Sequence, residues 1–186
     1  MMKYTPYFYI FAFLVSTTTF SQVTTPPKEN NMLNKHDLSI DFFNAFLNKY
    51  QISYEYILND YSSVGTSISY SPNIINVFSL AHKEKYSLKA NYRFYFSNKR
   101  AQGFFVEGYL RYSSGKYLYF NNQTNRAEYN NTYQSIYGGF NIGYKYVTKQ
   151  NIFFEASAGF GRAIYNFKGQ PNAFVPNIKL SIGKRF

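Results

Sequence analysis

The sequence contains no cysteine and no tryptophan, and it has only two histidines. The lack of cysteine excludes a disulfide scaffold, a cysteine-ligated zinc site, a thiol nucleophile and an N-terminal lipoprotein anchor. No segment approaches the roughly 18 consecutive apolar residues that a membrane-spanning helix needs. A helical inner-membrane protein is therefore excluded as well.

Aromatic residues are abundant instead, with 21 Tyr and 20 Phe in a chain of 186 residues. This content is too high for a disordered protein and unusual for a soluble helical domain. The length allows one domain with a short extension.

The N-terminus has the pattern of a secretory signal peptide. Lys3 precedes a mostly apolar stretch at residues 7–15, and small hydroxylated residues follow it. This order predicts a signal peptide over residues 1–21, cleaved after Ser21. An N-terminal membrane anchor or a buried helix is the alternative, but the apolar stretch is well short of the ~20 residues of a spanning helix. The polar residues 22–36, which include two prolines, then predict a periplasmic N-terminal linker.

From residue 37 to residue 186 the apolar residues alternate with a period of two, which predicts β-strands. Eight segments of this kind match the length of tilted membrane-spanning strands. We expect every proline of this region to fall outside the strands, since proline cannot donate to a ladder. The predicted strands are 37–47, 50–58, 63–71, 86–96, 103–113, 135–147, 152–164 and 177–186.

The connections between these segments alternate between short and long, apart from a tight first connection near residue 48. The long ones are 72–85, 114–134 and 165–176. Short turns at one end and long loops at the other are typical of outer-membrane barrels. The sequence therefore predicts an all-β fold, an eight-stranded antiparallel up-and-down transmembrane β-barrel.

The two faces of the predicted strands differ in charge. A soluble barrel would place its apolar face inside. Here the apolar face carries Tyr and Phe at both ends, as bilayer interfaces select. We therefore expect the apolar face to contact lipid and the charged face to fill the lumen with ion pairs, because an unpaired buried charge is very costly. The predicted lumen network consists of Asp41, Glu55, Lys89, Arg93, Glu107, Arg111, Lys145, Glu155, Lys179 and Arg185.

The last strand, IKLSIGKRF, has apolar residues at alternate positions and ends in Phe186. In this and in its architecture, the chain from residue 37 on resembles the small eight-stranded outer-membrane barrels of Gram-negative bacteria, of the OmpA-transmembrane-domain and OmpX type. It departs at Lys184, where an aromatic residue is more usual. The resemblance implies insertion by the barrel-assembly machinery, with Phe186 as part of the assembly signal. It fixes no function, because such barrels serve as anchors, adhesins and lipid A-modifying enzymes.

Neither His36 nor His82 belongs to a motif with metal-ligand or catalytic spacing. We therefore expect no cofactor and no catalytic residues, and a structural or surface-binding role as an anchor or adhesin. An open pore is not expected, because eight strands leave room for side chains only. The alternative is a lipid A-modifying hydrolase or transferase with His82, Glu84 and a loop serine such as Ser79 at the outer rim.

Two basic residues near the outer end of the seventh strand suggest a partner. Arg162 occupies one of the alternate positions of its strand that are predicted to face lipid, and Lys168 lies in the predicted loop that follows. A guanidinium is tolerated there only near the headgroups, where lipopolysaccharide carries phosphates that Arg binds well. We therefore expect both residues to contact lipopolysaccharide. Export argues against nucleic acid as a partner, and a monomer is expected.

Overall fold

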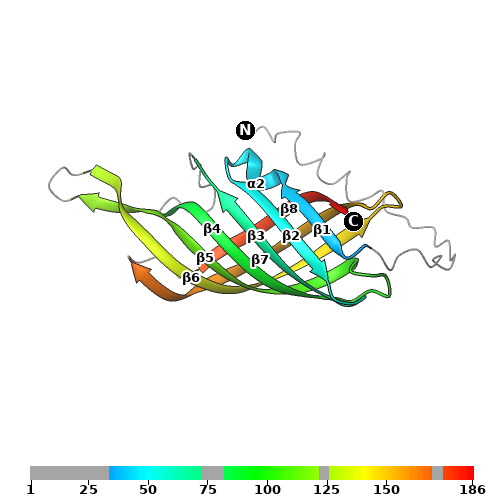
Figure 1. Cartoon of the computed structure of the whole chain (residues 1–186). Coiled ribbons are helices and arrows are strands. Elements are labelled where there is room, and N and C mark those ends of the chain that lie inside the picture. The colour runs from blue at the N-terminus through cyan, green and yellow to red at the C-terminus, as the bar shows by residue number, and fades with distance from the viewer. Residues whose placement is uncertain (1–33, 73–81, 122–125, 169–173) are drawn as a thin grey trace, which may run out of the picture. The chain divides into compact units, whose positions relative to one another are not determined.

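The computed structural model describes residues 34–72, 82–121, 126–168 and 174–186. They form a closed barrel in which every strand is antiparallel to its neighbours in the sequence and β1 closes on β8 (Figure 1). The prediction of an all-β, eight-stranded, up-and-down barrel is confirmed. The predicted signal peptide, 1–21, and most of the predicted linker lie outside the described residues. In the described part of the chain, no helix is long and apolar enough to cross a membrane.

The strands differ widely in length. Their bounds are β1 (His36–Asp41), β2 (Tyr50–Ile57), β3 (Ser62–Tyr70), β4 (His82–Tyr95), β5 (Gly103–Asn121), β6 (Arg126–Val147), β7 (Ile152–Lys168) and β8 (Phe174–Arg185), with a short helix, α2 (Phe42–Phe46), after β1. The β2–β3, β4–β5 and β6–β7 turns and both ends of the barrel chain lie at one end, here named the short-turn end. The opposite end of the barrel, where β3, β5 and β7 end, is here named the long-loop end.

The predicted loop 114–134 is wrong over most of its length, because β5 and β6 continue through it as a ladder that extends beyond their other neighbours, β4 and β7 (Figure 1). This extension consists of antiparallel backbone pairs, such as Lys116 with Thr132. Polar and aromatic residues are mixed along this part of the sequence, so the apolar alternation disappears while the backbone pairing goes on. Tyr and Thr favour strands without any alternation.

The predicted first strand, 37–47, is wrong after Asp41, where α2 begins. The side chain of Asp41 accepts a hydrogen bond from the backbone N–H of Asn44 at 3.0 Å and caps the helix. Such local side-chain bonds compete with a strand ladder and favour a helix start. The side-chain amide of Asn44 in turn donates to the backbone carbonyl of Ile178 on β8 at 3.0 Å.

Pro176 lies inside β8, contrary to the expectation that no proline falls within a strand. It is opposite Phe160 of β7. On its other side, β1 has already ended, because the last β1–β8 pair joins Asp41 and Ser181. A proline is tolerated at a position where one side of the strand has no ladder to complete.

Side chains alternate between a charged interior and an apolar exterior. Lys145 has no exposed surface, whereas Ile142, three residues earlier on the same strand, is 62% exposed. Large apolar side chains from all eight strands point outward, among them Ile40, Ile52, Ile68, Leu88, Leu110, Ile142, Phe154 and Ile182. The polar and apolar positions are thus inverted relative to those of a water-soluble barrel.

Glycines on the inner face make room for aromatic rings. A Cβ atom at Gly161 would lie 2.5 Å from the hydroxyl oxygen of Tyr109, and one at Gly139 would overlap the same ring. A Cβ atom at Gly183 would likewise overlap the ring of Phe153. Interiors are packed closely enough that an added methyl group must displace something.

A small apolar cluster closes the short-turn end. It consists of Ile57, Tyr95, Ala101 and Phe105, all essentially inaccessible to solvent. Ala101 belongs to the β4–β5 turn and adopts a positive φ of 40°. Its N–H donates to the carbonyl of Asp60 in the β2–β3 turn at 2.8 Å, which holds the turn over the lumen.

Candidate functional site

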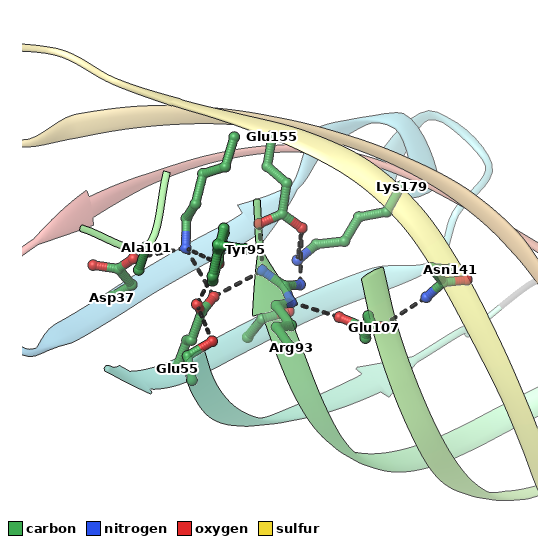
Figure 2. A network of polar contacts seen from close by, with 12 residues as sticks. Asp37, Glu55, Arg93, Tyr95, Ala101, Glu107, Asn141, Glu155 and Lys179 are labelled. Carbon is green, nitrogen blue, oxygen red and sulfur yellow. Dashed lines mark hydrogen bonds and ion pairs between the residues drawn. The ribbon is translucent and has the colours of Figure 1, made fainter. Parts of the chain in front are cut away.

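Arg93 on β4 is the centre of the charged lumen (Figure 2). Its Nε donates to Glu107 of β5 at 2.6 Å, and its Nη1 donates at 2.7 Å to both Glu55 of β2 and Glu155 of β7. Nη2 makes a further bond to Glu155 at 2.9 Å. One buried guanidinium thus connects three carboxylates that come from three other strands.

Two lysines and an asparagine complete the bonding of these carboxylates. Lys89 Nζ lies 2.8 Å from Glu107, and Lys179 Nζ lies 3.1 Å from Glu155. The amide of Asn141 donates to Glu107 at 2.7 Å. Buried charges are stable only when they are paired and hydrogen-bonded, and these carboxylates meet that condition.

A second group of ion pairs lies toward the short-turn end. Lys145 Nζ is 2.7 Å from Asp37 and 2.8 Å from Glu55, so it links this group to Arg93. Arg185 makes two parallel bonds to Asp37, at 2.8 and 2.9 Å. The same guanidinium donates to the carbonyls of Arg100 and Ala101, each at 2.9 Å. The last strand is thereby bonded to the first strand and to the β4–β5 turn.

A third group lies at the long-loop end. Glu84 Oε1 is 2.7 Å from Lys49 Nζ, and Glu84 Oε2 accepts a bond from the hydroxyl of Ser113 at 2.7 Å. Arg111 Nη1 is 3.8 Å from the same carboxylate. We call Lys49, Glu84, Arg111 and Ser113 the long-loop cluster.

The ten residues expected in the lumen are all buried in the structure. Nine of them form ion pairs within the described part of the chain. Asp41 does not, and its expected pairing with a basic residue is wrong, because its carboxylate caps α2 through Asn44.

Sequence reasoning missed several members of the lumen network, among them Lys49, which pairs with Glu84. Asp37 is two residues before Ser39, so the alternation places it on the same, lumen-facing side of the strand. It could have been predicted on that ground, but it stands at the very start of the predicted strand. Glu84 falls in the predicted loop 72–85, and the structure has a β-bulge or irregularity between Glu84 and Tyr86 that interrupts the alternation there. Tyr95 and Asn141 have the correct parity, but nothing in the sequence indicates their hydrogen bonds to Glu55 and Glu107.

Phe186 closes the barrel through its backbone. Its N–H donates to the carbonyl of His36 at 2.8 Å, and its carbonyl accepts from the N–H of His36 at 2.9 Å. The two rings stack with their centroids 5.8 Å apart, on the outer surface. His36 is therefore the first residue of the barrel and not the last residue of a linker.

Arg162 and Lys168 are both exposed on β7. The guanidinium of Arg162 lies over the ring of Phe174, 5.9 Å from its centroid. The backbone of His82 begins β4, but its side chain and Ser79 lie outside the described residues. A catalytic role for His82 stays an untested prediction.

The lumen between the ion pairs is tightly filled. A cavity of about 10 Å³ is lined by residues that include Ser39, Ser53, Asn91 and Lys179. It has room for about one water molecule. Among the residues that the structure describes, no three His, Asp or Glu side chains lie close enough together to hold a metal ion. This arrangement can stabilise the barrel and block its interior.

Comparisons with protein-family models, curated proteins and solved structures give no match for this chain.

Proposed function

We propose that the chain is an outer-membrane β-barrel with a structural or surface-binding role, whose lumen is sealed by charged side chains. The observation that carries the proposal is the inverted arrangement of the barrel, with ion pairs inside and a continuous apolar exterior. A water-soluble protein rarely exposes an apolar patch of more than a few hundred Å². In a bilayer the same exterior is favourable, because a closed barrel leaves no backbone group unpaired.

Aromatic side chains support the same placement. Exposed Phe94, Phe96, Phe104 and Tyr144 lie toward the short-turn end, with Phe186 at the seam. Exposed Tyr50, Tyr70, Tyr86 and Tyr112 lie toward the long-loop end. Such bands are favoured at the two interfaces of a membrane.

The orientation follows from the connections. In barrels of this kind, short turns face the periplasm and long connections face outward. The extended β5–β6 hairpin and the outer part of β7 therefore form the external surface. A partner of this protein binds there.

The sealed lumen argues against transport as the main role. Arg93 and its three glutamates occupy the centre of the barrel, and the cluster around Ala101 covers the short-turn end. We therefore propose a non-enzymatic protein that presents its outer surface while the barrel acts as the anchor. Arg162 and Lys168 are proposed to bind phosphates of lipopolysaccharide.

Fractionation of cells that express the whole chain tests the placement. We expect the protein in outer-membrane fractions, migrating faster on gels before boiling than after it. A protease site inserted between Asn121 and Arg126 should be cleaved on intact cells, and the same site inserted between Lys149 and Gln150 should be protected. Recovery in the soluble fraction, or the reverse cleavage pattern, would contradict the proposal.

A further inference from the structure

Lys184 interrupts the apolar outer face of β8 near the short-turn end. Its side chain is exposed, and its partners in the ladder are Leu38 of β1 on one side and Ile152 of β7 on the other. Ile182 and Phe186, two residues before and after it on the same face, are exposed as well. A positive charge therefore lies among apolar side chains that face lipid in the proposed placement.

The described part of the chain offers this ammonium no partner. Lys184 makes no ion pair and no side-chain hydrogen bond there. The strand carboxylates with described side chains all face the lumen, namely Asp37, Asp41, Glu55, Glu84, Glu107 and Glu155. Asp60 lies in the β2–β3 turn and forms no ion pair with Lys184. An ammonium at the edge of the hydrocarbon layer extends toward the headgroups, so the anion that it meets comes from the membrane.

A histidine with an unused ring nitrogen lies beside Lys184 on the same face. His36 of β1 exchanges two backbone hydrogen bonds with Phe186, so Lys184 is its diagonal neighbour across the β1–β8 seam. Diagonal neighbours in a ladder are about 7–8 Å apart, which a long side chain can bridge. Nδ1 of His36 is 2.7 Å from the hydroxyl oxygen of Tyr54 on β2. Nε2 has no hydrogen-bond partner among the described residues.

The hydrogen bond between His36 and Tyr54 leaves one donor free in either arrangement. If the hydroxyl of Tyr54 donates to Nδ1, the imidazole carries its proton on Nε2, which can donate outward. If Nδ1 donates to the hydroxyl oxygen, the hydroxyl hydrogen is free instead. The rings of Tyr56 and Phe186 hold the imidazole from two sides, with centroids 5.4 and 5.8 Å away. We call Lys184, His36 and Tyr54 the seam site.

We propose that the seam site binds the phosphate of an anionic glycerophospholipid in the leaflet at the short-turn end. The proposal rests on the outer-membrane placement given above, in which lipopolysaccharide lies at the opposite end. Lys184 donates a charge-assisted hydrogen bond to one phosphate oxygen, and His36 or Tyr54 donates to another. An ethanolamine headgroup is disfavoured, because the outer face of the described strands has no carboxylate to pair with its ammonium.

Native mass spectrometry of the full-length barrel, released from detergent micelles, tests the site. The protein is incubated with equal amounts of phosphatidylglycerol and phosphatidylethanolamine that carry the same acyl chains. We expect phosphatidylglycerol to stay bound with a preference of roughly tenfold, since a charge-assisted hydrogen bond is about twice as strong as a neutral one. Equal retention of the two lipids, or retention of neither, would overturn the proposal.

Lys184→Gln should lower the retention of phosphatidylglycerol about tenfold, because it removes the charge but keeps a polar side chain. Lys149→Gln is the matched control, since it removes an exposed cation from the β6–β7 turn at the same end. It should leave retention unchanged. An equal loss in both variants would show a general attraction of a basic protein for anionic lipid and would reject the site.

Tyr54→Phe tests the second donor while the charge of Lys184 stays in place. It removes the hydrogen-bond partner of His36 and should weaken retention roughly twofold to tenfold, as the loss of one neutral hydrogen bond does. Tyr61→Phe, at an exposed position of the β2–β3 turn, should have no effect. Unchanged retention in Tyr54→Phe would contradict the second donor.

Gel migration before and after boiling verifies that each variant is folded, so Tyr54→Phe still tests the site if Lys184→Gln fails to assemble. A folded barrel in outer-membrane fractions that shows no preference for phosphatidylglycerol would reject the seam site alone. Absence of the barrel from those fractions would instead reject the proposed placement on which the site depends.

Discussion

Arg93 and Glu155 are 62 residues apart in the chain and meet across the lumen in a two-bond pair, with Nη1–Oε2 at 2.7 Å and Nη2–Oε1 at 2.9 Å. The pair joins β4 to β7, which are not neighbours in the sheet. It therefore fixes the distance between opposite walls of the barrel, which the ladder of backbone hydrogen bonds alone does not do.

Arg93→Met should be among the most damaging single substitutions in the lumen. It leaves Glu55, Glu107 and Glu155 close together without their shared cation, and removing one partner of a dry ion pair costs about 3–5 kcal/mol. The free energy of unfolding in urea, measured in detergent micelles, gives the loss. Lys99→Met, at an exposed turn position, should change it by less than about 0.5 kcal/mol. Equal effects of the two variants would show that the network adds no stability.

Gly161→Ala should destabilise the barrel because the new methyl group meets the hydroxyl of Tyr109. Overpacking of this kind costs about 1–3 kcal/mol. Tyr109→Phe in the same chain should restore part of the loss, since it removes the overlapping oxygen. Gly108→Ala is the matched control, because no atom lies within 4 Å of a Cβ at that outward position. If the Gly161→Ala variant is as stable as the Gly108→Ala variant, the close contact between position 161 and the hydroxyl of Tyr109 is contradicted.

Phe186→Asp should prevent assembly, leaving unfolded protein in the periplasm. The substitution removes the ring that stacks on His36 and places a charge at the last pairing of β8. The ratio of the fast to the slow gel band in outer-membrane fractions measures folded barrel. Phe96→Asp changes another exposed phenylalanine at the same end and should leave most of the protein folded. Normal assembly of the Phe186→Asp variant would contradict the proposal that Phe186 is part of the assembly signal.

Arg162→Ala should reduce the amount of lipopolysaccharide that co-purifies with the folded barrel. A charge-assisted hydrogen bond of about 1.5–3 kcal/mol corresponds to tenfold or more in affinity. Lys149→Ala removes an exposed cation from the short-turn end and should have no effect. Unchanged retention in Arg162→Ala would reject this contact, while leaving the placement of the barrel intact.

The strands of the barrel could be predicted from the sequence because successive side chains lie alternately in the polar lumen and on the apolar exterior. Residues such as Leu88, Lys89 and Ala90 alternate between exterior and lumen, and this alternation is visible in any one segment. It fails where the sequence no longer alternates between apolar and polar residues, as in the β5–β6 extension. It also fails where a side chain stabilises another backbone path, as Asp41 does at α2.

The partners of the lumen charges could not be predicted in the same way. The alternation of side chains along each strand places Arg93 and Arg111 inside the barrel. The stagger and tilt of the strands decide which carboxylates lie opposite them. Arg93 meets three glutamates from three strands, while Arg111 reaches Glu84 only at 3.8 Å. That contrast depends on the three-dimensional arrangement of all the strands.

The early end of β1 has a consequence for association between molecules. On the N-terminal side of Ser181, the edge of β8 that faces β1 has no strand beside it in the described part of the chain. An open strand edge is a template for pairing with another chain. Asn44 of α2 occupies one of its acceptors by donating to Ile178. Pro176, two residues away, offers no N–H to an incoming strand. The helix and the proline together protect this edge from β-sheet pairing with another chain.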